Sequence, residues 1–378
     1  MIERKKLLFI VNVDWFFTSH RLPIAIEAIK QGYEVHIATS VTNKLDFLVD
    51  SGLIVHPINL HRSNTNVKTI YFEFMEVLLI IRKISPDIIH LVTIKPVLMG
   101  GIAARVLSIS SVVSAISGLG FIFMKRGIIA QFRRKAALFL YHLALGHPNQ
   151  KVIFQNRDDQ SLLSKLTILS SNRTVLIRGS GVDLTHYNMQ PLSKSRVPRV
   201  LFAARLLEDK GVREFVHAAE LVNSLKIRAN FVLAGDIDLL NPASIQQSEL
   251  DNWKEGGLVE FLGYREDMER VLSSAVIVVL PSYREGFPKV LIEAAACGRA
   301  VITTDVPGCR DAIENGVTGL LIPARSAKAI ANAVLVLLDD AQRCEEMGRA
   351  GRKRAENMFD VDQVVAEHIK VYKELLCH

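Results

Sequence analysis

The sequence predicts an α/β protein built from two doubly wound domains. Short apolar runs alternate with amphipathic stretches along the chain, as parallel strands alternate with the helices that cover them. The alternation restarts after a polar stretch at residues 190–198, which is rich in Ser, Lys and Pro. A single core rarely serves more than about 250–300 residues, so a length of 378 residues also favours two domains.

In the first half, continuous apolar runs predict buried parallel strands, and stretches with helical periodicity predict the helices between them. The expected strands are Leu7–Val13, Glu34–Thr39, Ile54–Ile58 and Asp87–Val92. The expected helices are His20–Gln31, Lys68–Ile84 and Val97–Leu107. Gly32 is a stop signal for the first of these helices.

The second half repeats this pattern. Its expected strands are Arg199–Ala203, Asn230–Ala234, Val259–Leu262, Val276–Leu280 and Ala300–Thr303. Its expected helices are Val212–Leu225, Met268–Ser273, Pro288–Ala296 and Ala327–Leu338. We therefore expect two Rossmann-like domains, 1–190 and 191–378, facing each other across a cleft, with the last helix a candidate to pack back on the first domain. Ligands of such sheets bind at the carboxyl ends of the strands.

Composition narrows the class of protein. Hydrophobic residues make up 49% and charged residues 22%, which fits a folded chain. The mean hydropathy is +0.23, yet no apolar run reaches the roughly 18–20 residues of a membrane span, and the start of the chain lacks a signal peptide pattern. The four cysteines show no metal-binding spacing, which predicts free thiols and a cytoplasmic location.

Charge is unevenly shared between the halves. Residues 1–190 hold 22 Lys/Arg and 12 Asp/Glu, a net charge of +10, whereas residues 191–378 hold 24 and 27, a net charge of −3. A basic first half suggests that this half faces something anionic. Charge alone leaves membrane phosphate, a phosphate-bearing acceptor and nucleic acid open.

The segment Pro281–Gly298 carries the strongest chemical signal. It follows a buried strand, and Pro288 suits the first turn of the next helix, whose free amides can hold phosphate. Gly286 allows close approach of the backbone, and Glu285 is expected at the edge of the sheet. Glu293 lies in the helix on a small, nearly uncharged face, so its carboxylate needs a partner such as a ribose diol. Two solvated glutamates beside an ordinary connection are the alternative.

Glu285 and Glu293 form an E-x7-E pattern that resembles the signature of the retaining glycosyltransferases of family 4, which have the GT-B fold. The resemblance extends over the C-terminal half and involves several segments in the family's order. These segments are Ala204–Leu206 with Lys210 and Gly211, Ala234–Asp236, Phe261–Tyr264, Asp305–Gly308, Glu314–Gly316 and Gly319.

This resemblance implies roles for specific residues. Arg205 and Lys210 would hold the donor diphosphate and balance the negative charge of the leaving group, which is electrostatic stabilisation where charge develops. Glu293 would bind the ribose, and Glu285 would contact the donor sugar. Phosphate and base contacts would come mainly from the backbone of Gly286, Phe287, Pro288, Lys289, Val290, Tyr264 and Arg265.

The Asp236-x-Asp238 pair could be read as a metal site. A helix start together with Arg and Lys can replace a divalent ion at a diphosphate, and the resemblance also implies metal independence. We therefore expect no metal and no cofactor other than the nucleotide-sugar donor.

The N-terminal half is expected to select the acceptor. Thr18–Pro23, Thr93–Pro96 and Ser117–Phe121 resemble a bacterial subgroup that extends sugars on undecaprenyl diphosphate and includes N-acetylgalactosaminyltransferases. His20, Arg21 and Lys95 are the candidate acceptor contacts, although His20 or Arg21 could simply cap a helix. Some members carry a histidine near the position of Ser117, and this chain does not.

The stretch Phe121–Leu145 mixes apolar residues with five Lys/Arg. A basic amphipathic stretch can lie on an anionic membrane surface, and the alternative is a packed helix with a solvated basic edge. If this stretch contacts the membrane, the protein is expected to lie peripherally on the inner face of the cell membrane.

Together these observations predict a retaining glycosyltransferase that moves a sugar from a UDP-sugar to a lipid-diphosphate-linked saccharide in bacterial glycan assembly. UDP-N-acetylgalactosamine is the favoured donor, and front-face displacement is the expected mechanism. The expected partners are this donor, the lipid-linked acceptor and an anionic membrane, without nucleic acid. A non-hydrolysing nucleotide-sugar 2-epimerase and a non-catalytic lipid- or carbohydrate-binding protein are the alternatives. A dehydrogenase is disfavoured because no GxGxxG follows the first strand.

Overall fold

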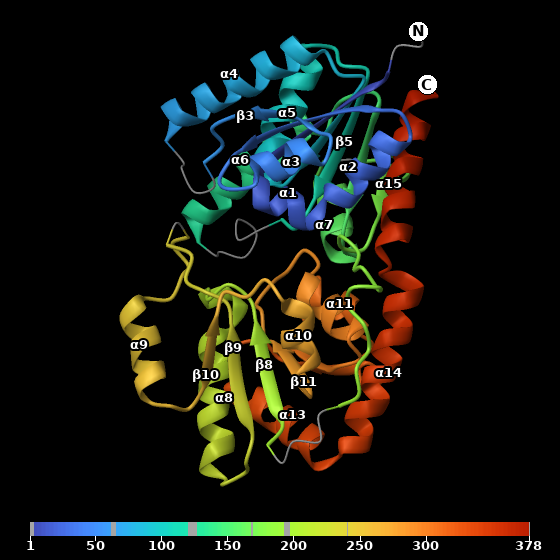
Figure 1. Cartoon of the computed structure of the whole chain (residues 1–378). Coiled ribbons are helices and arrows are strands. Elements are labelled where there is room, and N and C mark those ends of the chain that lie inside the picture. Colours follow the sequence, from blue (N-terminus) through green and yellow to red (C-terminus); the bar gives the residue numbers. More distant parts are fainter. Residues whose placement is uncertain are drawn as a thin grey trace. The chain divides into compact units, whose positions relative to one another are not determined.

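The computed structural model describes residues 4–61, 66–119, 127–167, 169–192, 197–239 and 241–377, with the side chains of residues 128–130, 132 and 133 left aside (Figure 1). The chain divides into two compact units. Unit 1 comprises residues 1–180 and 362–378, and unit 2 comprises residues 181–361. The assignment of acceptor binding to 1–190 and donor binding to 191–378 stays a prediction.

Unit 1 contains a seven-stranded parallel sheet in the order β3-β2-β1-β4-β5-β6-β7. The strands are β1 (Lys6–Val13), β2 (Glu34–Ser40), β3 (Ile54–Pro57), β4 (Ile88–Val92), β5 (Ser111–Ile116), β6 (Gln150–Phe154) and β7 (Thr174–Leu176). The helices are α1 (Asp14–His20), α2 (Leu22–Lys30), α3 (Leu45–Asp50), α4 (Val67–Ile84), α5 (Ile94–Val106), α6 (Ile128–Ala144), α7 (Arg157–Thr167) and the short 3₁₀ turn η2 (Ser171–Arg173).

The helix expected at His20–Gln31 is α2 (Leu22–Lys30), and a short helix, α1 (Asp14–His20), precedes it. Thr18–His20 ends α1, Arg21 separates the helices, and Leu22 with Pro23 begins α2. Proline has no backbone N–H to continue a preceding helix but fits the first turn of a new one. Thr18–Pro23 therefore spans the end of α1 and the start of α2.

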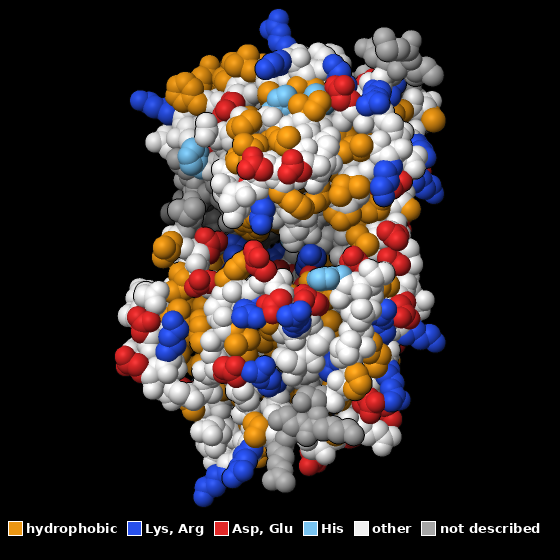
Figure 2. Space-filling view, viewed as in Figure 1, with side chains coloured by type: hydrophobic (Ala, Val, Ile, Leu, Met, Phe, Trp, Pro, Cys, Tyr) orange, Lys and Arg blue, Asp and Glu red, His pale blue; other side chains and the backbone are white. Residues whose placement is uncertain are grey.

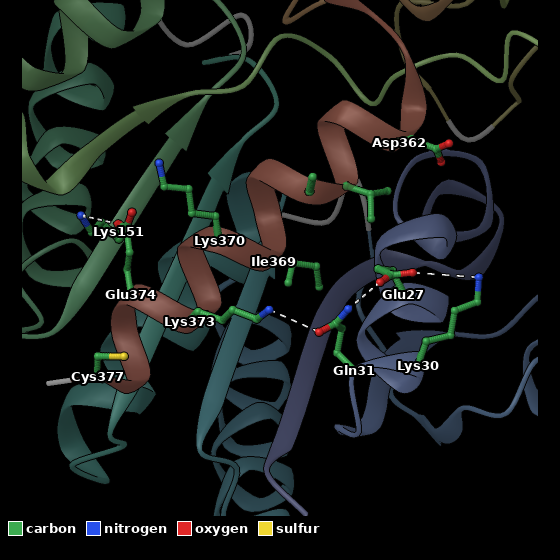
Figure 3. Close-up of a pocket in the computed structure, with 12 residues that line it drawn as sticks. Glu27, Lys30, Gln31, Lys151, Asp362, Ile369, Lys370, Lys373, Glu374 and Cys377 are labelled. Atoms are coloured by element: carbon green, nitrogen blue, oxygen red, sulfur yellow. Dashed lines mark hydrogen bonds and ion pairs between the residues drawn. The ribbon is translucent and has the colours of Figure 1, made fainter.

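Helix α15 (Val361–Leu376) belongs to unit 1 from Asp362 onward. It packs its buried face on the sheet, where Ser111 Oγ and Asn149 Nδ2 donate hydrogen bonds to the carbonyl of Leu375. Figure 3 shows the groove beside this helix, in which Lys151 pairs with Glu374 and Lys373 donates to Gln31. These contacts connect α15 with β6 and with the end of α2, so the groove lies entirely within unit 1.

Unit 2 contains a six-stranded parallel sheet in the order β10-β9-β8-β11-β12-β13. The strands are β8 (Arg199–Ala203), β9 (Asn230–Ala234), β10 (Glu260–Gly263), β11 (Ile277–Leu280), β12 (Ala300–Thr304) and β13 (Gly319–Ile322). The helices are η3 (Glu208–Lys210), α8 (Val212–Ser224), α9 (Gln247–Glu255), α10 (Met268–Ser273), α11 (Lys289–Ala296), α12 (Cys309–Ala312), α13 (Ala327–Asp339) and α14 (Ala341–Met358).

Both units have the core of a doubly wound sheet. The strand β4 of unit 1 and the strand β11 of unit 2 are buried at every residue, which explains their continuous apolar sequences. Two parallel-sheet α/β domains confirm the predicted fold class. Among the described residues, no helix combines the length and apolar character that a membrane span needs.

One glycine sets how closely two helices of unit 2 approach. A Cβ at Gly348 of α14 would lie 2.1 Å from the carbonyl oxygen of Gly298, which follows α11. We predict that Gly348→Ala lowers the free energy of unfolding by about 1–3 kcal/mol, because the clash outweighs the gain of about 1 kcal/mol in helix propensity. Urea unfolding measures the change.

Gly256→Ala is the matched control, since a Cβ there meets its nearest carbonyl oxygen at 3.3 Å. Its effect should stay within about 0.5 kcal/mol. A Gly348→Ala protein as stable as the control would contradict the close approach of α14 and α11.

Candidate functional site

The predicted donor residues gather at the carboxyl edge of the unit 2 sheet. The order of the strands reverses between β8 and β11, which is where ligands bind in such sheets. Arg205 and Lys210 follow β8, and Glu285 follows β11. The switch point therefore brings together three residues that lie up to 80 positions apart.

Lys210 and Glu285 form an ion pair across this point, with 2.5 Å between Nζ and Oε1. Ser282 Oγ donates to the same carboxylate oxygen at 2.7 Å. Gly211, with φ +74°, makes the turn from η3 into α8, where a Cβ would lie 2.3 Å from the carbonyl oxygen of Pro281. Only glycine lets this turn lie so close to the end of β11, and the turn carries Lys210 to its partner.

Arg205 pairs with Asp238, with 2.6 Å between Nη1 and Oδ2. One member of the Asp236-x-Asp238 pair is thus a counter-ion of a predicted phosphate-binding residue. In the described part of the chain, no group of three or more His, Cys, Asp or Glu side chains is placed to hold a metal ion.

Glu293 is buried in α11, one turn from the start of the helix. Lys289 Nζ lies 3.3 Å from its carboxylate. Tyr187 also hydrogen-bonds to Glu293, and the pKa of Tyr187 is raised, first by burial and then by the charge of this glutamate. Glu293 therefore has partners on the protein and a fixed orientation.

The other predicted donor contacts surround the same edge. Pro288 precedes α11 and Phe287 is buried against Phe359, while Gly286, Lys289 and Val290 are half-buried at the start of the helix. Tyr264 and Arg265 follow β10 and are exposed, and Arg265 pairs with Asp267. The roles assigned to all these residues stay predictions.

Asp209 lies among the candidate donor residues, and the sequence did not reveal it. It is buried beside Lys210, and among the described residues its Oδ1 has no hydrogen-bond partner. Burial raises the pKa of this carboxyl; Lys210 lowers it and Glu285 raises it further, and the net shift is upward. An acidic residue next to a lysine in a loop looks like a surface pair in the sequence, so only the fold identifies it.

In unit 1 the strand order reverses between β1 and β4. The register pairs Ile10 with Leu91, so Asn12 and Thr93, each two residues further along, both lie at the carboxyl edge. Asn12 Oδ1, Thr93 Oγ1 and Ser117 Oγ are buried and have no hydrogen-bond partner in the described structure. Thr93 also has a φ of +75°, a strained value for a residue with a branched side chain.

Lys95 lies at the start of α5 near this edge. Its Nζ is 2.5 Å from Glu73 Oε2 and donates to the carbonyl of His61 at 2.7 Å. Burial alone would raise the pKa of Glu73, but hydrogen bonds from Lys95 and His61 outweigh burial and lower it. Glu73 of α4 thus holds Lys95 and the backbone of residue 61 in place.

His20 and Arg21 are placed differently. His20 stacks on Phe16 and its Nδ1 contacts the carbonyl of Phe16, so it is half-buried at the end of α1. Arg21 is 1% exposed, with its guanidinium inside unit 1, and it makes no side-chain cap of α2. Acceptor contact by either residue stays a prediction. Of the segment Ser117–Phe121, Gly120 and Phe121 lie outside the described residues.

Two family descriptions match the sequence. Residues 197–340 match "Glycosyl transferases group 1", and residues 6–156 match "Glycosyl transferase 4-like". The chain belongs to these glycosyltransferases. The enzyme therefore transfers a hexosyl or N-acetylhexosaminyl group, and its fold is GT-B.

Several known glycosyltransferases are similar over most of their length. One is the N,N'-diacetylbacillosaminyl-diphospho-undecaprenol α-1,3-N-acetylgalactosaminyltransferase of Campylobacter jejuni, 29% identical over 94% of this chain and 95% of that protein. A second is the UDP-Gal:α-D-GlcNAc-diphosphoundecaprenol α-1,3-galactosyltransferase of Escherichia coli, 24% identical over 79% of this chain and 78% of that protein. The crystal structure of HepE from Anabaena in complex with UDP and glucose has a TM-score of 0.77 at 18% identity, over 98% of this chain and all of that one. This structure shows the shared fold.

Replacement of Glu293 tests the donor site of this glycosyltransferase. We predict that Glu293→Gln weakens UDP binding roughly tenfold to a hundredfold, because a charge-assisted hydrogen bond to ribose is worth about 1.5–3 kcal/mol. Isothermal titration calorimetry measures the affinity. The exposed Glu255→Gln of α9 is the control, and an unchanged UDP affinity in a folded Glu293→Gln protein would exclude the ribose role.

Replacement of Asp209 tests how its ionised carboxylate affects the stability of the folded chain and the binding of UDP. The pKa of Asp209 is higher in the folded chain than its ordinary value of 3.8, so ionised Asp209 lowers the free energy of unfolding. This destabilisation is absent below pH 3.8 and grows as the pH rises from 3.8 towards the raised pKa of the folded chain. We predict that Asp209→Asn raises the melting temperature more at pH 7 than at pH 5. It should also tighten UDP binding at pH 7 about threefold to tenfold, since a like charge near the diphosphate is removed.

Thermal unfolding and calorimetry at both pH values give the readouts, with the exposed Asp339→Asn as the control. A variant that is less stable than the parent at pH 7 would mean that Asp209 is ionised and favourably paired.

Proposed function

We propose that this glycosyltransferase moves N-acetylgalactosamine from UDP-N-acetylgalactosamine to a saccharide linked to undecaprenyl diphosphate, with retention at the anomeric carbon. The cluster of Arg205, Lys210 and Glu285 at the unit 2 switch point carries this proposal. Similarity to the Campylobacter jejuni N-acetylgalactosaminyltransferase over nearly the whole length of both chains supports the choice of sugar and of lipid carrier. Assembly of bacterial surface glycans is the corresponding process.

The donor would lie at the carboxyl edge of unit 2. Arg205, Lys210 and the free amides at the start of α11 would face the diphosphate, so no metal is needed to balance its charge. Glu293 would accept hydrogen bonds from the ribose, and the backbone near Tyr264 and Arg265 would contact the base. The complex of HepE with UDP and glucose, which has the same fold, supports a uridine nucleotide.

The acceptor would be bound by unit 1. Within the described residues, the buried oxygens of Asn12, Thr93 and Ser117 have no hydrogen-bond partner, and the hydroxyl groups of a saccharide can supply the donors or acceptors that they need. Lys95, fixed by Glu73, would pair with a phosphate of the lipid carrier. An undecaprenyl-linked acceptor also requires the enzyme to work at a membrane, and we place it on the inner face.

In the reaction, a hydroxyl oxygen of the acceptor forms the new bond to the anomeric carbon on the face from which UDP departs. The bond from that carbon to the diphosphate oxygen breaks, and the proton of the hydroxyl moves to the departing phosphate. Arg205 and Lys210 stabilise the charge that develops on UDP. Glu285, already bonded to Lys210 and Ser282, would orient the donor sugar.

The stretch Phe121–Leu145 stays a predicted membrane contact. Residues 121–126 lie outside the described part of the chain, and helix α6 follows from Ile128. Exposed apolar side chains on its described part include Phe139.

A panel of UDP-sugars with a synthetic short-chain polyprenyl-diphosphate saccharide tests the proposal. We predict that UDP-N-acetylgalactosamine gives the fastest transfer, that the activity survives EDTA, and that the product keeps the α-configuration of the donor. Mass spectrometry identifies the product, and proton coupling constants give its configuration. Lys210→Ala and Arg205→Ala should each lower turnover about a hundredfold or more while the protein stays folded.

Three results would contradict the proposal or one of its parts. Epimerised nucleotide sugar formed without any acceptor would support a 2-epimerase, and wild-type turnover by Lys210→Ala would exclude its role at the diphosphate. Full loss of activity in EDTA, restored by magnesium or manganese, would return Asp236 and Asp238 to consideration as metal ligands.

A further inference from the structure

Helix α4 of unit 1 has an apolar face on both sides. Its inner side carries Val77, Ile81 and Ile84, which are buried in the core. Its outer side is exposed, where an ordinary surface helix carries polar residues. Tyr71 is 58% exposed, Phe72 68% and Leu79 58%.

The exposed residues form one continuous stripe. Tyr71 and Phe72 lie four and three positions before half-buried Met75, and Leu79 lies four positions after it, so these side chains share a helix face. Hydrophobic side chains gather over α4 in the upper left of Figure 2, with basic side chains beside them. Isolated exposed apolar residues are common, but a contiguous stripe with two aromatic rings marks an interaction surface.

The basic residues of α4 are exposed, whereas its acidic residues are bonded to other parts of the chain. Lys68, Arg82 and Lys83 are exposed at its two ends. The two acidic residues are engaged by the chain itself: Glu73 is buried against Lys95, and Glu76 accepts a hydrogen bond from the amide of Asn59. The outer stripe therefore combines apolar and basic side chains without an acidic residue.

We propose that α4 docks on an anionic phospholipid surface. Aromatic and aliphatic side chains would enter the boundary between headgroups and acyl chains, while the lysines and arginine meet lipid phosphates. A second copy of this chain is a poorer occupant. In a symmetric dimer the same patch meets itself, so basic groups would face basic groups.

The proposal rests on the lipid-linked acceptor proposed above and gives the membrane contact a defined surface. Glu73 joins the two functions because it lies on the inner side of α4 and holds Lys95. A helix seated on the membrane would thereby present Lys95 at a fixed height above the lipid phosphates. This surface is separate in sequence from Phe121–Leu145.

Vesicle sedimentation with the full-length chain tests the docking surface. We predict binding to vesicles of phosphatidylcholine mixed with phosphatidylglycerol, and weaker binding to phosphatidylcholine alone or at high salt. The triple variant Lys68→Glu, Arg82→Glu, Lys83→Glu should lower the partition coefficient about a hundredfold or more, because each reversal removes an attraction and adds a repulsion. Phe72→Ser with Leu79→Ser should lower it about tenfold or more.

The matched control changes the net charge equally but lies in unit 2: Arg228→Glu, Lys328→Glu, Lys353→Glu, all at exposed positions. It should keep most of the binding. Equal losses in both triple variants, or no loss in either α4 variant, would overturn the proposal. A dimer in sedimentation velocity that Phe72→Ser with Leu79→Ser dissociates, without vesicle binding, would assign the stripe to self-association instead.

Turnover on a short-chain, water-soluble acceptor separates this proposal from the proposed function. The α4 variants should keep that turnover, since none of the replaced side chains contacts the site. Vesicle binding through α4 in a chain that transfers no sugar would leave the docking surface intact and reject the proposed function.

Discussion

Every strand of both sheets runs parallel to its neighbours, and this constraint decides where the chemistry can lie. Parallel strands bring all their carboxyl ends to one edge, and the connections diverge where the strand order reverses. In unit 2 that point is bridged by Lys210 and Glu285. In unit 1 it is marked by the strained backbone of Thr93 and by buried oxygens that have no hydrogen-bond partner in the described part of the chain. The two edges thus differ in chemistry: one is rich in charge, and the other is polar and nearly neutral.

The cations at the charged edge of unit 2 are already paired before any ligand binds. Arg205, Lys210 and Lys289 each pair with a carboxylate, and buried Asp209 adds a further acidic group. Three cations and four carboxyl groups cannot attract a diphosphate through net charge. Binding must therefore exchange carboxylate partners for phosphate at short range, with the free amides of α11 adding positive potential. The raised pKa of Asp209 follows from its surroundings, because burial and the charge of Glu285 both disfavour its ionised form.

The sequence predicted the fold class because the alternation of strand and helix is a local pattern. It also offered Glu285, Glu293, Arg205 and Lys210 as candidate donor contacts, since motifs at strand ends are local as well, and the structure gathers these candidates at one edge. The partners of these residues could not be predicted in the same way. Asp238 lies 33 residues from Arg205, and Tyr187 lies more than 100 residues from Glu293, so their pairing exists only in the folded sheet. The apolar stripe of α4 was hidden because periodicity alone does not say which of two apolar faces is covered.

Arg21 is a further residue whose surroundings exist only in the folded chain. It is buried beside His90 of β4 and beside His368 and Tyr372 of α15, and among the described residues no carboxylate pairs with it. Burial lowers the pKa of Arg21 to about 10 and that of His368 to about 3, and it also lowers the pKa of His90. The histidines therefore stay neutral, with His90 hydrogen-bonded to Tyr372 and stacked on His368, and the weakly hydrated guanidinium is the single charge of the group. Because α15 supplies two of these side chains, the last helix completes the core of unit 1, although more than 180 residues of unit 2 separate it from the rest of that core.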